Sequence, residues 1–223
     1  MSSLDTSNAE TPNPDSLSAA LARHAIELTD DQIALLEKYC QRLWDWNTRL
    51  NLTRHTDYEK FVARDVVDSQ WLERFLESGE SVLDVGTGGG VPGIVLAVLR
   101  PDLDVALCDS VAKKAKAVAA IVDEIGLKLL VHHAPAQDVI QRLRFDTLVV
   151  RAVAPLSKLL TWFNPHWDRF ERILVLKGPA WVEERADARE RRLLNGLRLS
   201  KLATYPLPGT ESESVVLQIR RHD

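Results

Sequence analysis

The residues best suited to binding chemistry lie in a glycine-rich stretch, residues 84–93, which reads Asp-Val-Gly-Thr-Gly-Gly-Gly-Val-Pro-Gly. An apolar run precedes these glycines, and the apolar segment that follows them, residues 93–99, has the pattern of a helix. A strand, a tight turn and a helix start bring bare backbone against a flat, polar ligand, because glycine has no Cβ atom. The stretch therefore predicts a site for a nucleoside cofactor.

Two nucleotide classes can be weighed against this stretch. Gly88, Gly90 and Gly93 satisfy the G-x-G-x-x-G pattern of dinucleotide-binding proteins, and Asp109 follows at the spacing where an acid holds a ribose. In that fold, however, the first glycine follows the strand almost at once, and no acid is expected at the strand end. A mononucleotide P-loop is excluded, because no Gly-Lys-Ser or Gly-Lys-Thr follows the loop. A nicotinamide-dependent oxidoreductase stays open as an alternative.

A third cofactor class, S-adenosylmethionine, fits the acids better. Asp84, at the tip of the first strand, can lie near the ammonium group of the methionine part, and Gly86 and Gly88 let the backbone approach. Asp109, at the end of the next strand, can accept hydrogen bonds from both ribose hydroxyls, because the carboxyl ends of adjacent strands converge on one crevice. Both acids also have a structural interpretation, as caps of the helices that follow them. We favour a methyltransferase.

The elements that must position these residues alternate between strand and helix patterns after Gly79. Strand patterns cover residues 82–85, 104–108, 128–132, 147–151, 173–177, 198–205 and 214–220, and helical patterns between most of them cover residues 93–100, 111–125, 155–164 and 182–194. This alternation predicts an α/β, Rossmann-like methyltransferase fold with a seven-stranded, mostly parallel sheet and helices on both faces. No helix pattern separates the last two strands, so we expect the final strand to be antiparallel.

The part of the chain before residue 79 has a different pattern of polar and apolar residues. Residues 1–16 are polar and punctuated by proline, so we expect a disordered tail. From residue 17 to residue 78 apolar residues recur at helical spacing, and Asp30-Asp31-Gln32-Ile33 has the pattern of a helix start. We expect residues 17–78 to form an N-terminal helical cap packed on the sheet, with residues 79–223 as the methyltransferase domain.

Composition narrows the partners and the compartment. The 223-residue chain has a net charge of −4, which argues against a protein that coats nucleic acid by bulk charge, so RNA binding would need a local patch. Cys40 and Cys108 lie far apart, which fits a reduced compartment and gives no zinc site. No apolar run is long enough to span a bilayer, and the N-terminus lacks a signal-peptide pattern. We therefore expect a soluble cytoplasmic protein.

Several separate motifs resemble those of the bacterial small-subunit rRNA methyltransferase G family, also called glucose-inhibited division protein B. Residues 47–53 (Asn-Thr-Arg-Leu-Asn-Leu-Thr) resemble its N-x-x-x-N-L-T element, and residues 84–94 resemble its cofactor loop down to the Pro-Gly pair. Asp109-Ser110 with Lys113-Lys114 resembles its D-S-x-x-K-[KR] motif. Residues 151–156 and 176–178 resemble its R-A-[VF]-A-x-L and K-G motifs. The resemblance covers roughly residues 35–220, in the family's order and spacing.

This resemblance implies transfer of a methyl group from S-adenosylmethionine to N7 of one guanine in the decoding region of 16S rRNA, within a small ribosomal subunit or its precursor. In the family the cofactor is held by the residues that match Gly86, Val91, Ala136, Gln137 and Arg151. Because guanine N7 carries a free lone pair, the reaction needs positioning rather than a general base, and we expect no catalytic side chain. We expect a monomer that uses neither a metal nor a membrane.

The chain departs from the family pattern at three places. The family element R-H-x-x-D-S appears at residues 64–69 as Arg-Asp-Val-Val-Asp-Ser, with Asp65 in place of the usual His. An acid at this position would repel RNA phosphate, so Asp65 is not counted among the site residues. Gln137 replaces the usual Glu and can still accept from the adenine amino group through its amide oxygen. Residues 138–144 are also shorter than in the family.

The cations near the loop leave two questions open. Arg151 could pair with the methionine carboxylate or hold the base and phosphate, and its structural interpretation is an ion pair. Other cations could form a local basic face beside the crevice: Arg42, Arg49, Arg54 and Arg64, with Lys113, Lys114 and Lys116 on its rim. A non-catalytic RNA-binding assembly factor on the same fold is a further alternative, although the expected cofactor residues are all present.

Overall fold

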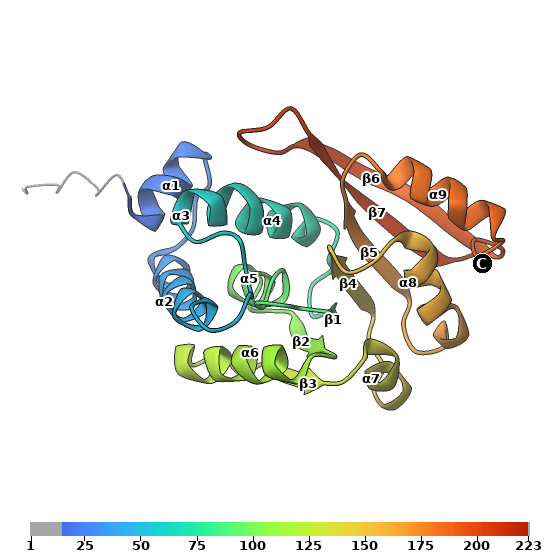
Figure 1. Cartoon of the computed structure of the whole chain (residues 1–223), viewed down its shortest axis with the longest axis horizontal. Helices are drawn as coiled ribbons and strands as arrows, with labels where there is room; N and C mark the ends of the chain where they lie inside the picture. The colour runs from blue at the N-terminus through green and yellow to red at the C-terminus, as the bar shows by residue number, and fades with distance from the viewer. Residues whose placement is uncertain (1–14, 223) are drawn as a thin grey trace, which may run out of the picture.

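In the computed structural model, which describes residues 15–222, seven strands form one sheet in the order β3-β2-β1-β4-β5-β7-β6 (Figure 1). The strands are β1 (Ser81–Val85), β2 (Asp104–Asp109), β3 (Leu130–His133), β4 (Thr147–Arg151), β5 (Arg172–Lys177), β6 (Leu197–Pro206) and β7 (Glu213–Arg221). The first five strands are parallel, whereas β7 pairs antiparallel with both β5 and β6. The predicted fold, with its antiparallel last strand, is confirmed.

Helices cover both faces of the sheet (Figure 1). On one face lie α5 (Gly93–Leu99), α6 (Ala112–Ile125) and the N-terminal helices; on the other lie α7 (Ala136–Arg142), α8 (Leu156–Phe163) and α9 (Trp181–Glu190). Successive side chains of a strand point to opposite faces. Accordingly, Val82 of β1 packs in the core that contains α5 and α6, and Leu83 packs in the core that contains α8.

Helix α7 was not predicted from the sequence. Its buried residues are only Ala136, Val139 and Ile140, and charged or polar residues fill the rest of its seven positions. An amphipathic pattern of two turns is too short to distinguish from a polar loop. The helix begins after Pro135, whose backbone is in an extended conformation. The 3₁₀ turn η2 (Asn164–His166) after α8 was not predicted either.

The N-terminal layer is built from α1 (Leu17–Arg23), α2 (Asp30–Asn47), α3 (Tyr58–Lys60), the π-helical segment η1 (Phe61–Val66) and α4 (Val67–Glu73). The expected helix start at Asp30 is confirmed, with a capping box between Thr29 and Gln32. Ser16 caps α1, and the rest of the expected tail falls on residues 1–14, outside the described residues. No helix in residues 15–222 is long and apolar enough to cross a membrane.

The N-terminal layer and the sheet share one hydrophobic core. Leu36, Tyr39 and Leu43 of α2 are fully buried in the same cluster as Ile94 of α5 and Ile121 of α6. These side chains hold the N-terminal helices against the sheet. The division into a cap and a methyltransferase domain at residues 78 and 79 stays a prediction.

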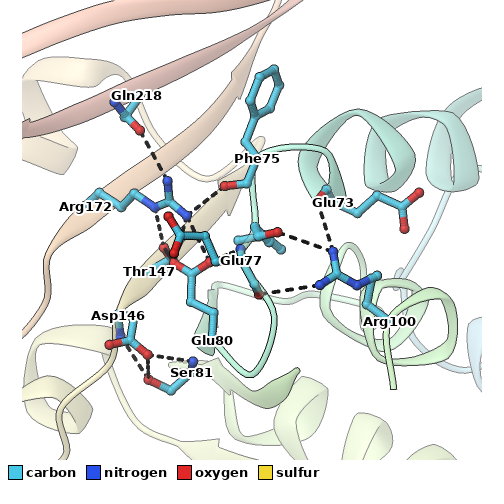
Figure 2. Close-up of polar contacts among 11 residues, drawn as sticks. Glu73, Phe75, Glu77, Glu80, Ser81, Arg100, Asp146, Thr147, Arg172 and Gln218 are labelled. Atoms are coloured by element: carbon cyan, nitrogen blue, oxygen red, sulfur yellow. Dashed lines mark hydrogen bonds and ion pairs between the residues drawn. The ribbon is translucent and has the colours of Figure 1, made fainter. Parts of the chain in front are cut away.

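A polar network closes the amino ends of the parallel strands (Figure 2). The glycine loop follows the carboxyl end of β1 and lies at the opposite edge of the sheet. Arg172, the first residue of β5, donates from Nη2 to both carboxylate oxygens of Glu80 at 2.9 Å and to the carbonyl oxygen of Phe75 at 2.7 Å. The hydroxyl of Thr147, the first residue of β4, also donates to Glu80. The buried carboxylate therefore joins the starts of β1, β4 and β5.

Candidate functional site

The sheet forms a crevice where the strand order reverses. From β1 the chain continues outward through β2 and β3, and it then returns to β4 on the other side of β1. The carboxyl ends of β1 and β4 therefore lie side by side, with Val85 in register with Val150. Ligands of open α/β sheets bind at such a reversal, because the helices that follow the two strands lie on opposite faces.

The loop after β1 needs glycine for its conformation and for space. Gly86, Gly88 and Gly90 have φ angles of +66°, +60° and +107°, a region where other residues are strained. A Cβ atom at Gly86 would lie 2.9 Å from Cγ2 of Val153. At Gly88 the nearest atom to such a Cβ would be the carbonyl oxygen of Gly86, 3.9 Å away. The backbone at Gly88 is thus open to a ligand that a side chain would block.

Asp84 is fully buried beneath this loop. Its Oδ2 accepts hydrogen bonds from the Thr87 hydroxyl at 2.6 Å and from the backbone N–H of Gly93, the first residue of α5, at 2.8 Å. Burial raises the pKa of Asp84 to about 6, against the lowering effect of these hydrogen bonds. Oδ1 has no hydrogen-bond partner among the described residues, so it keeps its acceptor capacity for a ligand.

Asp109 joins the glycine loop to the next helix. Its Oδ2 accepts from the backbone N–H of Gly88 at 3.0 Å, and its Oδ1 accepts from the N–H of Val111, just before α6, at 2.8 Å. Each carboxylate oxygen retains a second lone pair, so the same side chain can also accept from hydroxyls of a ligand. The structure thus brings Asp84, Gly88 and Asp109 together around one loop.

The remaining expected cofactor residues lie at the same edge of the sheet. Ala136 and Gln137 begin α7 after β3, the neighbour of β2. Ala136 is buried in a cluster with Val85, the last residue of β1, whereas Gln137 is partly exposed. Val91 is partly exposed at the far end of the glycine loop.

Arg151, at the end of β4, is held by two buried acids of the N-terminal layer. Its Nη2 donates to Oδ1 of Asp65 at 2.5 Å, and its Nη1 donates to Oδ2 of Asp68 at 3.1 Å. Asp65 also lies 2.9 Å from Nδ1 of His55, and Asp68 accepts from the Tyr205 hydroxyl at 2.7 Å. The structural interpretation of Arg151 as an ion pair is therefore confirmed, and its contact with a ligand stays a prediction.

The two acids respond differently to burial. Burial by itself raises the pKa of Asp65, but the Arg151 charge and the hydrogen bond to His55 outweigh it and hold this pKa below its usual range. For Asp68, burial prevails over the Arg151 charge and the Tyr205 hydrogen bond, so the pKa is raised. The shorter contact of the Arg151 guanidinium is likewise with Asp65, at 2.5 Å against 3.1 Å for Asp68.

A cavity of about 750 Å³ opens beside this ion pair. Residues 51–55, which we call the roof segment, line it together with Arg64, Asp68, Arg151 and Ala152. Ala152 has a φ of +55°, which is uncommon for a non-glycine residue and is typical of functional sites. Nε of Arg64 is buried and has no partner among the described residues. The cavity thus contains cationic donors that the fold itself does not use.

A second hollow, of about 390 Å³, is lined by residues 47–51 together with Lys113 and Lys114 of α6. We call it the basic groove. Arg49, Lys113 and Lys114 form no ion pair with another described residue, whereas Arg42 pairs with Glu124 and Asp45. The expected basic face is therefore narrower than the sequence indicates. The basic groove and the cavity meet at Asn51, which lines both.

Two of the polar residues before the cavity have structural roles. Oδ1 of Asn47 accepts from the N–H groups of Leu52 and Thr53, at 2.8 and 3.0 Å, and the Thr53 hydroxyl accepts from the N–H of His55 at 2.9 Å. These bonds shape the roof segment. The exposed Asn51 makes no hydrogen bond with another described residue and stays free for a ligand.

Sequence reasoning missed the acid partners of Arg151. Asp65 and Asp68 lie three positions apart in a helical stretch rich in apolar residues, so they share the buried face of that helix. Buried acids need a cationic partner, and this was the available signal. His55 and Tyr205 carried no signal, because they come from segments far from Arg151 in the sequence.

Comparison with solved structures supports the fold. M. capricolum TrmK in complex with S-adenosyl-homocysteine is similar with a TM-score of 0.55 and 11% identity, over 70% of this chain and 68% of that one. MtNAS in complex with MTA and tNA is similar with a TM-score of 0.56 and 14% identity, over 93% of this chain and 76% of that one. At such low identity the likeness is one of fold.

Comparison with sequences identifies the family. Ribosomal RNA small subunit methyltransferase G of Rhodopirellula baltica is 46% identical over 194 residues, 87% of this chain and 84% of the relative. The protein of the same name from Chlorobaculum tepidum is 34% identical over 168 residues, 74% of this chain and 77% of the relative. The family model described as rRNA small subunit methyltransferase G matches residues 32–207. The chain therefore belongs to the rRNA small subunit methyltransferase G family.

Proposed function

We propose that this chain transfers the methyl group of S-adenosylmethionine to N7 of a guanine in the decoding region of 16S rRNA, as a cytoplasmic monomer that acts on the small ribosomal subunit or its precursor. The names of its relatives support rRNA as the substrate and argue against the oxidoreductase alternative. The proposed placement of the base beside the cofactor rests on one observation. Arg151 and Ala152 line the cavity, and Val153, in the same short segment, packs against Gly86. A base in the cavity and a cofactor at the loop would thus border the same short segment, so the two reactants would be neighbours.

The residues around the glycine loop fit S-adenosylmethionine. Open backbone at Gly88 admits the ligand, and Asp109 offers lone pairs to the ribose hydroxyls. Oδ1 of Asp84 is an acceptor for the methionine ammonium group, and Ala136 and Gln137 would hold the adenine. When bound, the cofactor supplies a methyl group on a positively charged sulfur.

The chain's own contribution to the reaction is alignment. Guanine N7 has a free lone pair, so its methylation removes no proton from the nucleophile and requires no general base. A donor on N7 would block this lone pair, whereas O6 and the phosphate are free to accept. Arginine carries five N–H donors, and Arg151 uses two of its nitrogens for Asp65 and Asp68. Its remaining N–H groups and those of Arg64 can orient the base through O6 and the phosphate.

The basic groove supports an extended RNA substrate. Phosphate contacts by lysine and arginine supply most sequence-independent affinity for nucleic acid. Arg49, Lys113 and Lys114 form no ion pair with another residue of the described part of the chain, and Asn51 connects the groove to the cavity. A nucleotide in the cavity would therefore place its neighbouring phosphate at these cations.

The decisive experiment is transfer of label from S-adenosylmethionine to small subunits that lack this modification, followed by nucleoside analysis. We expect 7-methylguanosine in the 16S rRNA. Label on another atom or on another RNA would contradict the proposed acceptor. Cofactor binding without transfer to any RNA would favour the non-catalytic assembly factor.

A further inference from the structure

Asp65 is the centre of a buried polar chain that joins two sides of the cavity. Its carboxylate is 1% exposed and bonds Arg151 through Oδ1 and His55 through Oδ2. His55 belongs to the roof segment, and Arg151 ends β4. One side chain on η1 therefore connects the roof segment to the central sheet.

At His55, its last residue, the roof segment makes few other hydrogen bonds. The carbonyl oxygen of His55 accepts from Nε1 of Trp44 at 2.8 Å, and its N–H donates to the Thr53 hydroxyl. Both bonds involve only the backbone of His55 and connect it to α2 or to the roof segment itself. The ring of His55 connects the roof segment to η1. Among the described residues, it is hydrogen-bonded to Asp65 alone.

On the other side, Asp65 fixes the plane of the Arg151 guanidinium. A guanidinium is planar and rigid, so holding Nη1 and Nη2 on different carboxylates determines the direction of its remaining N–H groups. Asp68 holds one nitrogen but accepts from Tyr205 as well. Without Asp65 the guanidinium could rotate about its bond to Asp68.

We propose that Asp65 is a positioning residue of the acceptor cavity, which aligns Arg151 and the roof segment around the RNA nucleotide. This inference rests on the proposed function. It also explains how an acid stands where the family pattern has His. The carboxylate does not face phosphate, because it is buried, neutralised by Arg151 and covered by His55.

The test compares Asp65→Asn with a matched variant at the opposite edge of the sheet, Glu80→Gln. Both substitutions keep the size of a buried carboxylate that is paired with an arginine, and Glu80 lies far from the cavity at the starts of the strands (Figure 2). Both variants should unfold at lower temperature than the unsubstituted protein. Only Asp65→Asn should lower kcat on small subunits, by about 10- to 100-fold, because misalignment by a fraction of an ångström slows a reaction that depends on positioning. The dissociation constant for S-adenosylmethionine should change less than kcat does, because Asp84, Gly88 and Asp109 keep their contacts.

A second readout is independent of activity. In ¹⁵N NMR of the arginine side chains, restricted rotation should give separate Nη signals for Arg151, assigned with Arg151→Lys. We expect these signals to merge in Asp65→Asn and to persist in Glu80→Gln. Unchanged kcat and unchanged Arg151 signals in Asp65→Asn would overturn the inference, as would equal kinetic losses in both variants. An unsubstituted protein that methylates no subunit would refute the proposed function instead, and the NMR comparison would still decide the role of Asp65.

Discussion

The hydroxyl of Tyr39 in α2 donates a hydrogen bond of 2.9 Å to the carbonyl oxygen of Gly89 in the glycine loop. Tyr39 is fully buried, and burial raises its pKa well above the usual value, so the phenol stays protonated and donates. A residue of the N-terminal layer thus holds the proposed cofactor loop directly. This layer therefore contacts the proposed cofactor loop and also lines the proposed RNA cavity.

Replacing Tyr39 with Phe should loosen the loop. The substitution leaves the buried carbonyl oxygen of Gly89 without this donor, which typically costs about 1–3 kcal/mol of unfolding free energy. We also expect weaker binding of S-adenosylmethionine, because part of the binding free energy must then order the loop. Urea unfolding and calorimetric titration measure the two effects. Tyr58→Phe is the control, because the Tyr58 ring packs on Trp44 outside the loop; equal losses of cofactor affinity in both variants would contradict this role.

Gly88→Ala should abolish most cofactor binding with little additional effect on the fold. Its Cβ would meet no protein atom nearer than 3.9 Å, but it would enter the space assigned to the ligand. Gly126→Ala is a matched control, because Gly126 has a φ of +79°, has nothing within 4 Å of its Cβ position and caps α6 away from the loop. Each substitution should cost about 1 kcal/mol of stability through its positive φ. Methyl transfer and cofactor affinity should fall only in Gly88→Ala, and equal affinities in both would place the cofactor elsewhere.

Much of the fold follows from periodicity and turn chemistry. All seven strands were predicted from apolar runs bounded by polar turns, and β1, β2, β4 and β5 are buried on both faces, which makes such runs continuous. Helix α7 was missed because its three buried residues define no clear period. The π-helical segment Phe61–Val66 was missed because an apolar helical stretch does not reveal one widened turn.

The glycine loop was predictable because its motif lies within one short segment, whereas the pairings within the ion-pair cluster were not. Asp84, Gly88 and Asp109 come from adjacent strand ends, so a parallel sheet necessarily brings them together. Asp65 meets Arg151 across 86 positions of sequence and Tyr205 meets Asp68 across 137. Such contacts depend on how the N-terminal layer packs against the sheet, which a pattern within one segment does not encode.

The stability of the protein should depend on pH through Asp84. Burial raises the pKa of Asp84 to about 6, so the folded state binds this proton more tightly than the unfolded chain does. The resulting contribution to stability is complete below about pH 4 and is lost as the pH rises through about 6. Asp84→Asn keeps an acceptor for Thr87 and Gly93 but does not titrate. The unfolding free energy of the unsubstituted protein, relative to the variant, should fall by on the order of 2 kcal/mol between pH 4 and pH 7; a constant difference would show that Asp84 does not titrate there.

The basic groove should control the salt dependence of RNA binding. Lys113 and Lys114 line it, whereas Lys116, on the same helix and exposed, does not. A lysine that contacts phosphate releases a counterion on binding, so its loss reduces the slope of log affinity against log salt by about 1. Lys113→Gln and Lys114→Gln should each produce this reduction and raise KM for small subunits, with kcat and cofactor affinity unchanged. Lys116→Gln changes the net charge by the same amount and should leave the slope as it is. If all three variants reduced the slope equally, the RNA would respond to the overall charge of the helix, and the groove would not be the phosphate site.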